Sequence, residues 1–329
     1  MRETIVGALL PAAITIALGY LAARHHDFGA SEATILIRMV MSYALPTALF
    51  VGTVSRTRDE LLRDLPLLVV LAVAILGLYG AVVLVARFAF HWSAGRSALA
   101  ALAASAPNVG FVGPTVLGTL YGTASGLPVA IGNLVLVLTV IPLTVLLLAL
   151  DADTHPPPPI RPRTPPASTS SPAAASRSGM TGKLIAALTQ PIVWLPLLGV
   201  VLVLSGRSLP RLLTQALTLL GQSASGVALF AAGIILAVHT ARVTPGVAAL
   251  VLIKNIAEPA LVWGSLLLLG YQNPLLGEAV VTTALPILVT VAMLAVQYQV
   301  AEGEMASALG LGMISSAVTV AGFIALTGA

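Results

Sequence analysis

The stretch SAPNVGFVGPTVLG, residues 105–118, interrupts a long apolar segment with two prolines, three glycines and one asparagine. In a helix interior, proline and glycine cost about 3 and about 1 kcal/mol relative to alanine. Pro107 and Pro114 each lack an N–H group and clash with the preceding turn. Gly110 and Gly113 let the backbone leave helical geometry between them. This stretch therefore predicts a helix that is broken near its middle.

The composition around this stretch is that of a membrane protein. Of the 329 residues, 58% are apolar and only 9% are charged, and the mean hydropathy is +1.01. Soluble domains carry about 25% charged residues. The apolar residues form runs of about 20, the length that crosses a hydrocarbon core, and they do not alternate as in a membrane β-barrel. We predict an all-α polytopic membrane protein.

Several classes of function are disfavoured by what the sequence lacks. There is no cysteine, which excludes disulfides and thiolate metal sites. The formal net charge of +4 comes mostly from loops, without a basic stripe interleaved with aromatics, and it indicates membrane topology rather than nucleic-acid binding. No Walker motif is present, which argues against ATP-driven transport. We expect no metal and no organic cofactor.

About ten spans can be placed, separated into two groups of five by a polar segment. The segment covers residues 151–183, is rich in Pro, Ser and Ala, and should be a disordered linker. We therefore expect a first five-helix unit in residues 1–150 and a second in 184–329. The predicted spans are 4–23, 33–54, 65–90, 97–119, 126–150, 184–205, 213–238, 245–270, 277–299 and 303–326.

The two units resemble each other at a shift of 179 or 180 residues. A duplicated unit of five helices enters the membrane from the opposite side, which predicts an inverted repeat about an axis in the membrane plane. Shared bias in an Ala/Leu-rich chain is the alternative. The matches are Pro11 with Pro191, Leu18-Gly19 with Leu198-Gly199, Ala48-Leu49-Phe50 with Ala228-Leu229-Phe230, Pro66 with Pro245, and Pro107 with Pro286.

The ninth span, VVTTALPILVTVAMLAVQY, is the repeat partner of the broken fourth span, and Pro286 lies near its centre. Backbone groups freed by a break cannot face lipid, so they must line a cavity or be buried in protein. Thr282 and Thr283 can hydrogen-bond freed carbonyls or line a polar site. The start of a half-helix at mid-membrane also carries N–H donors and partial positive charge, which suit an anion. A simple proline kink in span nine is the alternative.

Charged residues within the spans are further candidates, because intramembrane charges are expensive. Lys254, Asn255 and Glu258 lie in span eight, with Lys254 and Glu258 four residues apart on one helix face. Lys254 could attract an organic anion and Glu258 could carry a proton, or the pair could only stabilise the packing. Arg38, near the linker-side end of span two, is expected to snorkel to the interface.

Several motifs together resemble the auxin efflux carrier family, which includes plant PIN proteins and bacterial carriers of malonate and related organic acids. They are N-x-G-F-x-G-P at residues 108–114, SYALPTALF at 42–50, ALFAAG at 228–233 and the proline-broken span nine. The resemblance covers all ten spans. It implies the fold of bile-acid transporters and sodium/proton antiporters, with inverted five-helix repeats and crossed spans four and nine. Spans 1, 2, 6 and 7 would form a scaffold, and spans 3–5 and 8–10 a transport domain.

The resemblance also assigns residues. It implies that Asn108 contacts a substrate carboxylate and that the span-nine crossing lies around Pro286. Leu285 and Ile287 flank this proline, whereas plant members commonly carry a second asparagine, so the sequence departs from a plant auxin pocket. Asn133 in span five would lie beside the crossing, either supporting it or bonding a neighbouring helix.

Orientation follows from the resemblance more than from charge. It implies a plasma-membrane protein with a cytoplasmic linker 151–183, both termini outside, and a homodimer through scaffold helices. Counting Lys and Arg gives eight on the linker side against six on the side of the termini. Without the four linker charges this count reverses, so the positive-inside rule gives little information about the orientation of the chain.

We therefore predict a secondary transporter of small organic anions, of the efflux-carrier type, whose coupling to H⁺ or Na⁺ is open. The predicted substrate-binding residues are Pro107, Asn108, Gly110, Gly113, Thr283 and Pro286, with Asn133, Lys254 and Glu258 supporting or coupling. A cation/proton antiporter on the same fold is the alternative, with Glu258 as its carboxylate. A receptor would bind without flux. A membrane enzyme is disfavoured, since the spans contain no nucleophile–base or metal-ligand cluster.

Overall fold

The computed structural model describes residues 2–55, 65–122, 126–151, 189–207, 209–239 and 242–328. These residues are built of helices, and the β-type pairing among them is one isolated bridge between Pro107 and Ile287. Six helices in this part of the chain are long and apolar enough to cross a membrane: Ala30–Val54, Leu67–Phe88, Pro128–Asp151, Arg211–Val238, Pro245–Leu268 and Glu302–Thr327.

Helices occupy each of the five spans predicted in the first half of the chain. The first span is α1 (Arg2–Arg24), and the third is α5 (Leu65–Phe88). The fourth is split into two short helices, as its prolines and glycines predict. The remaining elements are α2 (Ala30–Met39), η1 (Val40–Ala44) and α3 (Leu45–Val54) in span two, α6 (Ala94–Ser105) and α7 (Val109–Tyr121) in span four, and α8 (Gly126–Val135), η3 (Leu136–Val140) and α9 (Ile141–Asp151) in span five.

The second half is built in the same way, with its ninth span split. Its elements are α11 (Pro191–Leu204), α12 (Arg211–Val238), α13 (Pro245–Leu252), η5 (Ile253–Ala257), α14 (Glu258–Leu268), α15 (Leu275–Ala284), α16 (Thr290–Tyr298) and α17 (Glu302–Thr327). The exact number of crossings and the inverted repeat stay predictions.

The start of the predicted linker needs a correction. Asp151 ends α9 and is buried, and its carboxylate accepts hydrogen bonds from the Ser93 hydroxyl (2.7 Å) and the Ala94 N–H (3.2 Å) at the start of α6. A carboxylate is favourable at a helix N-terminus, which holds this residue on the helical bundle. The rest of the linker, 152–183, lies outside the described residues.

The segments η1, η3 and η5 are single π-helical turns, each placed just before a proline. Pro46, Pro142 and Pro259 each lie two residues beyond the end of such a turn. A proline ring clashes with the carbonyl four residues earlier and leaves it without a donor, and a widened turn relieves this clash. Spans two, five and eight therefore stay continuous through their prolines.

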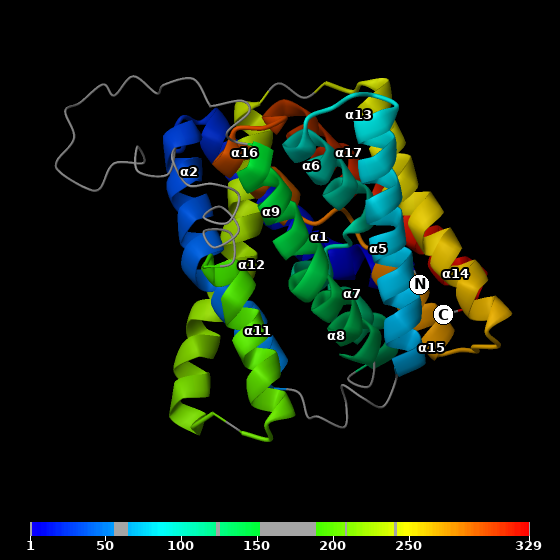
Figure 1. Cartoon of the computed structure of the whole chain (residues 1–329). Coiled ribbons are helices and arrows are strands. Elements are labelled where there is room, and N and C mark those ends of the chain that lie inside the picture. The colour runs from blue at the N-terminus through cyan, green and yellow to red at the C-terminus, as the bar shows by residue number, and fades with distance from the viewer. Residues whose placement is uncertain are drawn as a thin grey trace.

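The helices pack in two groups, and Figure 1 shows α2, α11 and α12 on one side and α5, α6, α14 and α15 on the other. In one group, α1 lies along α12, and α3 packs against α11 and α12. In the other, α5 and α9 pack on α6, and α14 and α17 pack on α15. The division into a scaffold and a transport domain, and their relative movement, stay predictions.

Backbone contact joins α1 to α12 at two glycines. A Cβ atom at Gly19 would overlap the carbonyl oxygen of Phe230, and one at Gly233 would overlap the carbonyl oxygen of Ile16. Small residues allow membrane helices to approach this closely, and packing of this kind drives their association in lipid.

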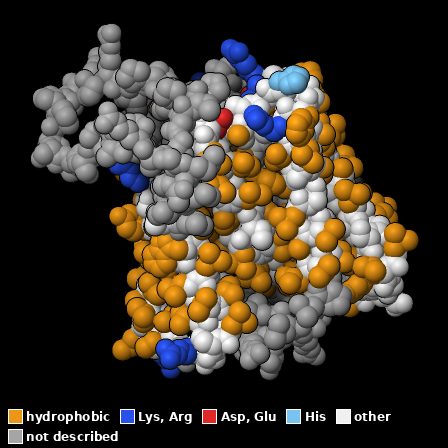
Figure 2. Space-filling model, viewed as in Figure 1, with side chains coloured by type: hydrophobic (Ala, Val, Ile, Leu, Met, Phe, Trp, Pro, Cys, Tyr) orange, Lys and Arg blue, Asp and Glu red, His pale blue; other side chains and the backbone are white. Residues whose placement is uncertain are grey.

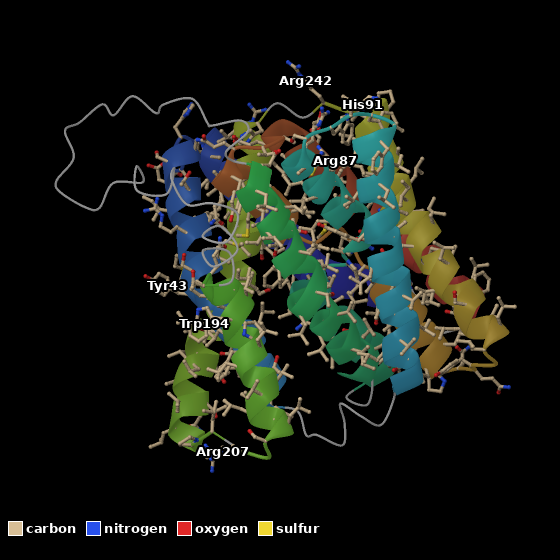
Figure 3. The ribbon with its side chains drawn as sticks, viewed as in Figure 1. Tyr43, Arg87, His91, Trp194, Arg207 and Arg242 are labelled. Atoms are coloured by element: carbon tan, nitrogen blue, oxygen red, sulfur yellow. The ribbon has the colours of Figure 1, made fainter. Side chains whose placement is uncertain are left out.

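The surface agrees with a membrane location. On the face seen in Figure 2, hydrophobic side chains cover the middle, and Lys and Arg lie toward the ends. Figure 3 places Arg87, His91 and Arg242 at one end of the molecule and Arg207 at the opposite end. Large apolar side chains such as Phe88 and Leu268 are exposed on the surface. Together with the apolar helices, this distribution is typical of an integral membrane protein.

Candidate functional site: the crossing of two interrupted helices

The interruptions of spans four and nine meet and pair with each other. The Asn108 N–H donates to the Pro286 carbonyl (2.8 Å), and the Leu288 N–H donates to the Ala106 carbonyl (3.0 Å). These two bonds form the antiparallel bridge between Pro107 and Ile287. Since unpaired backbone groups are very costly in a membrane interior, the two breaks satisfy each other. The predicted crossing of spans four and nine is present in the structure.

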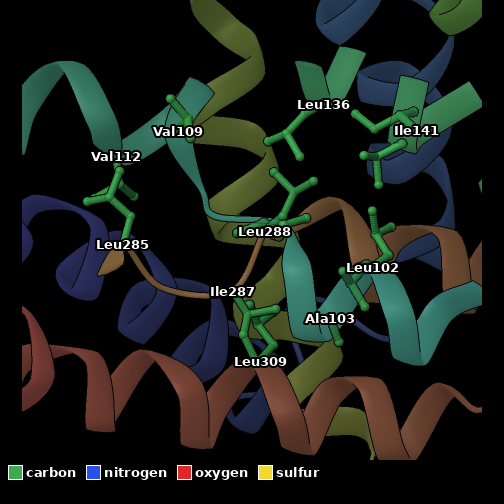
Figure 4. Close-up of a cluster of buried hydrophobic side chains, with 14 of the residues drawn as sticks. Leu102, Ala103, Val109, Val112, Leu136, Ile141, Leu285, Ile287, Leu288 and Leu309 are labelled. Atoms are coloured by element: carbon green, nitrogen blue, oxygen red, sulfur yellow. The ribbon is translucent and has the colours of Figure 1, made fainter. Parts of the chain in front are cut away.

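Apolar side chains enclose this crossing. Figure 4 shows the two non-helical segments running between their half-helices, with Leu102, Val109, Leu285, Ile287 and Leu288 around them. All of these side chains are buried. The crossing is thus a polar backbone junction in an apolar surrounding, where electrostatic interactions are stronger than in water.

The start of α7 presents open donors at the crossing. The first bond of its regular i to i−4 pattern runs from the Val112 N–H to the Asn108 carbonyl (3.0 Å). The N–H groups of Gly110 and Phe111 precede this bond, and the Asn108 side chain does not cap them. Uncapped N–H groups at a helix start carry partial positive charge and form a site for anions.

Asn108 itself is fully buried, and neither its Oδ1 nor its Nδ2 has a hydrogen-bond partner among the described residues. Thr290, at the start of α16, is in the same state: its hydroxyl is buried and unpartnered within that part of the chain. Leaving a buried polar group unpaired costs about 1–3 kcal/mol. Such groups on both sides of one crossing mark a place where a ligand can supply the missing partners.

A cavity of about 220 Å³ lies against the starts of α7 and α16, between the two groups of helices. Its polar lining comes from Thr53 of α3, Asn133 of α8, Thr290, and the backbone of Gly110. The remaining wall is apolar: Leu45, Ala48, Leu49, Gly52, Val109, Phe111, Val129, Ala130, Leu134, Leu136, Val137, Ile141 and Leu288. Its shape suits a small molecule with an apolar body and one polar end.

The structure places only some of the predicted site residues at the cavity. Gly110 and Asn133 line the cavity. Asn108 follows Pro107 in the crossing, but its side chain is buried and does not line the cavity. Pro107 and Pro286 form the crossing itself. Thr283 is buried in α15, where its hydroxyl donates to the Val280 carbonyl at 3.0 Å. Thr282 donates to Glu278 in the same way, so neither threonine lines this cavity.

The interpretation of the two glycines needs a correction. Neither Gly110 nor Gly113 leaves helical geometry, because α7 runs unbroken from Val109 to Tyr121 and the interruption lies at Ala106–Asn108. Instead both glycines allow close packing. A Cβ at Gly110 would lie 3.2 Å from the Asn133 Oδ1, and one at Gly113 would lie 3.4 Å from a methyl of Val129. The break depends on the proline, and the glycines bring α8 against α7.

Lys254 contacts the end of α15 at the crossing and does not line the cavity. Its Nζ donates to the carbonyls of Thr283 (2.6 Å) and Leu285 (3.0 Å) and lies 2.9 Å from the Glu258 Oε2. Lysine thereby caps the carbonyl end of α15, where the helix ends without further N–H donors. Both charged side chains are fully buried. With its three protons directed at these oxygens, Lys254 does not reach the cavity.

Asn255 ties span eight to α17. Its Nδ2 donates to the Gly312 carbonyl (3.0 Å) and to the Ser315 hydroxyl (2.8 Å). Together with Lys254, this places the π-helical turn η5 where it holds both the broken span nine and its neighbour. Among the described residues, no group of three or more His, Asp or Glu side chains could hold a metal ion.

The sequence interpretation missed Phe111, Thr290 and Thr53. One signal was present, since Phe111 and Thr290 are 179 residues apart, the same shift that relates Pro107 to Pro286. The repeat thus pointed to the starts of both second half-helices. For Thr53, which faces the cavity from the other group of helices, the sequence contained no such signal.

Comparison with known proteins agrees with this architecture. The chain matches the family described as "Membrane transport protein" over residues 4–324. It is 31% identical over 281 residues to the protein named "Uncharacterized transporter YfdV" in Escherichia coli K12, an alignment covering 82% of this chain and 79% of that protein. The same values hold for YfdV of Escherichia coli O157:H7 and of Shigella flexneri. The chain therefore belongs to the membrane transport protein family, the family of the auxin efflux carriers.

Proposed function

We propose that this transporter carries small organic anions by secondary, alternating-access transport through the crossing of spans four and nine. The observation that supports this most directly is the pair of buried, unpartnered side chains, Asn108 and Thr290, next to a cavity at the start of α7. A carboxylate would accept hydrogen bonds from the first-turn N–H groups, as anions do at helix starts. The Asn133 amide and the Thr290 hydroxyl would complete its contacts.

In this proposal Asn108 is covered in the conformation described here and becomes accessible when the two groups of helices separate. The cavity lies between α3 on one side and α7, α8 and α16 on the other, so a shift of one group against the other changes access to it. The linker 151–183 would be cytoplasmic and both termini outside. Movement of H⁺ or Na⁺ would drive transport, and scaffold helices would form a homodimer.

The test of this proposal is flux in proteoliposomes. The purified chain is reconstituted, and uptake of radiolabelled acetate, malonate, malate, succinate and indole-3-acetate is measured under imposed H⁺ or Na⁺ gradients. We expect uptake of at least one acid above empty liposomes. The Asn108→Ala variant should reduce this uptake about 10- to 100-fold, because hydrogen bonds to a charged group contribute about 1.5–3 kcal/mol.

The Asn108→Ala variant removes a side chain that forms no hydrogen bond within the described part of the fold. Its removal therefore costs the fold no hydrogen bond. Gln222→Ala is the matched control, since it removes an exposed amide of α12 away from the crossing. Wild-type flux and unchanged substrate binding in Asn108→Ala would refute the assignment.

Cation/proton antiport is the second candidate, and Glu258 is the observation that favours it. Apart from the ion pair with Lys254, neither of its carboxylate oxygens accepts a hydrogen bond within the described residues. A pH jump across liposomes that contain no organic acid separates the two functions. Cation-dependent proton movement that is lost in Glu258→Gln would support the antiporter, and its absence with intact acid flux would support the carrier.

A further inference from the structure

A second cavity, of about 400 Å³, lies apart from the crossing and shares no lining residue with the first. It is bounded by α2, the end of α12 and the turn from α16 to α17, which converge at one end of the bundle in Figure 1. Polar side chains make up much of its wall, including Arg38, Ser42, Gln297 and Gln299. We call it the Arg38 cavity.

Arg38 is an exposed charged side chain within an apolar helix. It lies eight residues into the apolar helix Ala30–Val54, which corresponds to about 12 Å along the axis. Charged side chains within a membrane span are costly unless they have a partner or face a water-filled cavity. No hydrogen bond or ion pair connects Arg38 to any residue of the described part of the chain, and its side chain lines the cavity.

The other ionisable side chains of this cavity contact each other. The His239 Nε2 lies 2.8 Å from the Glu302 Oε2, and its Nδ1 lies 3.0 Å from the Ile235 carbonyl. The Glu302 carboxylate is thus already engaged by His239, whereas Arg38 has no hydrogen-bond or ion-pair partner among the described residues.

We propose that the Arg38 cavity is a second anion site, which binds a small soluble carboxylate through the Arg38 guanidinium. Arginine offers two parallel N–H donors that match the two oxygens of a carboxylate. The Gln297 and Gln299 side chains, which make no hydrogen bond with the described residues, add amide donors. Ser42 and Thr34 also line the cavity, and a wall this polar suits a soluble anion better than the acyl chain of a lipid.

The ligand would bridge two groups of helices. Arg38 and His239 belong to helices of the α1–α12 group, whereas Gln297, Gln299 and Glu302 belong to α16, α17 and their connection. Occupancy would therefore depend on how the two groups are arranged. The site does not require the crossing to bind substrate, and its test does not require transport.

The test uses the absence of cysteine from the chain. Ser42→Cys places a single thiol in the cavity wall, and its rate of modification by a charged methanethiosulfonate reagent is measured on the full chain in phosphatidylcholine nanodiscs. Sodium succinate should slow modification, relative to sodium chloride at equal ionic strength. Adding Arg38→Gln should raise the half-protecting succinate concentration about tenfold or more, because the charge-assisted pair is lost.

Three variants make the result specific. Arg38→Lys should keep part of the protection, since it keeps the charge but not the fork of donors. Arg24→Gln, which removes an arginine at the end of α1 outside the cavity wall, should keep all of it. Asn108→Ala should also keep it, which separates this site from the crossing.

Two results would overturn the proposal. One is protection that is unchanged by Arg38→Gln or abolished by Asn108→Ala. The other is a thiol already protected, without succinate, in nanodiscs containing phosphatidylglycerol and released by Arg38→Gln, because a lipid headgroup would then be the occupant.

Discussion

At the scale of single residues, Lys254 shows how an intramembrane charge can serve the backbone. Its ammonium group replaces the donors that α15 loses where it ends at Ala284, and Glu258 balances its charge. The two candidate roles considered for this pair, anion attraction and structural support, are therefore not equal in the structure. The contacts favour support of the broken helix, and the cavity lies elsewhere.

Lys254→Met tests this role. It leaves Glu258 as an uncompensated buried charge and the carbonyls of Thr283 and Leu285 without donors, so we expect a loss of about 3–5 kcal/mol. Stability is measured as the free energy of unfolding in mixed detergent micelles. The double variant Lys254→Met/Glu258→Gln should recover only part of this loss, because the two carbonyls stay unpaired. Full recovery would mean that the ion pair alone matters.

At the scale of elements, close backbone contact joins α1 to α12. Gly19 belongs to the repeat match Leu18-Gly19, and Gly233 ends the ALFAAG motif at residues 228–233. Lipid offers no hydrophobic driving force between helices, so close packing of small residues has to supply the attraction. This contact should therefore be the most sensitive point of its group of helices.

Gly233→Ala should destabilise the protein, because its new methyl group would overlap the Ile16 carbonyl and push α1 away. Overpacking of this kind costs about 1–3 kcal/mol. Gly226→Ala on the same helix is the matched control, since a Cβ there meets nothing within 4 Å. It should be neutral or stabilising by up to about 1 kcal/mol through helix propensity. Equal unfolding free energies for the two variants would contradict the role of this contact.

At the scale of the whole molecule, few polar contacts between described residues cross between the two groups of helices. His239 to Glu302 joins α12 to α17, and the Gln190 side chain donates to the Tyr298 hydroxyl at 2.9 Å. In contrast, Arg96 and Glu304 form a two-bond ion pair between α6 and α17, within one group. If the groups move against each other during transport, the contacts between the groups must break, whereas the Arg96–Glu304 ion pair within one group persists.

Crosslinking distinguishes these two pairs. The double variant His239→Cys/Glu302→Cys, joined by a short bifunctional thiol reagent that is cleaved by reductant, should block acid flux reversibly. Arg96→Cys/Glu304→Cys, joined by the same reagent, should leave flux nearly unchanged. The chain has no other cysteine, so each crosslink is defined. Full flux in the crosslinked first pair would exclude relative movement at this position.

Local features of the sequence were sufficient for much of the fold. Runs of apolar residues predicted helices in every span, and Pro107 and Pro286 predicted the two interruptions, because proline removes a donor wherever it stands. The family resemblance is confirmed by the match over residues 4–324. The same reasoning placed the break too far along span four, since it counted Gly110 and Gly113 as part of it.

The sequence by itself determined a helical membrane transporter with two broken spans, because hydropathy and backbone chemistry act over a few neighbouring residues. Only the tertiary structure decided which residues of different spans contact each other. The pairing of Asn108 with Pro286, the capping of α15 by Lys254, and the cavities beside Thr290 and Arg38 each join residues from different spans. Such contacts depend on how whole helices approach and rotate, and no local pattern records this geometry.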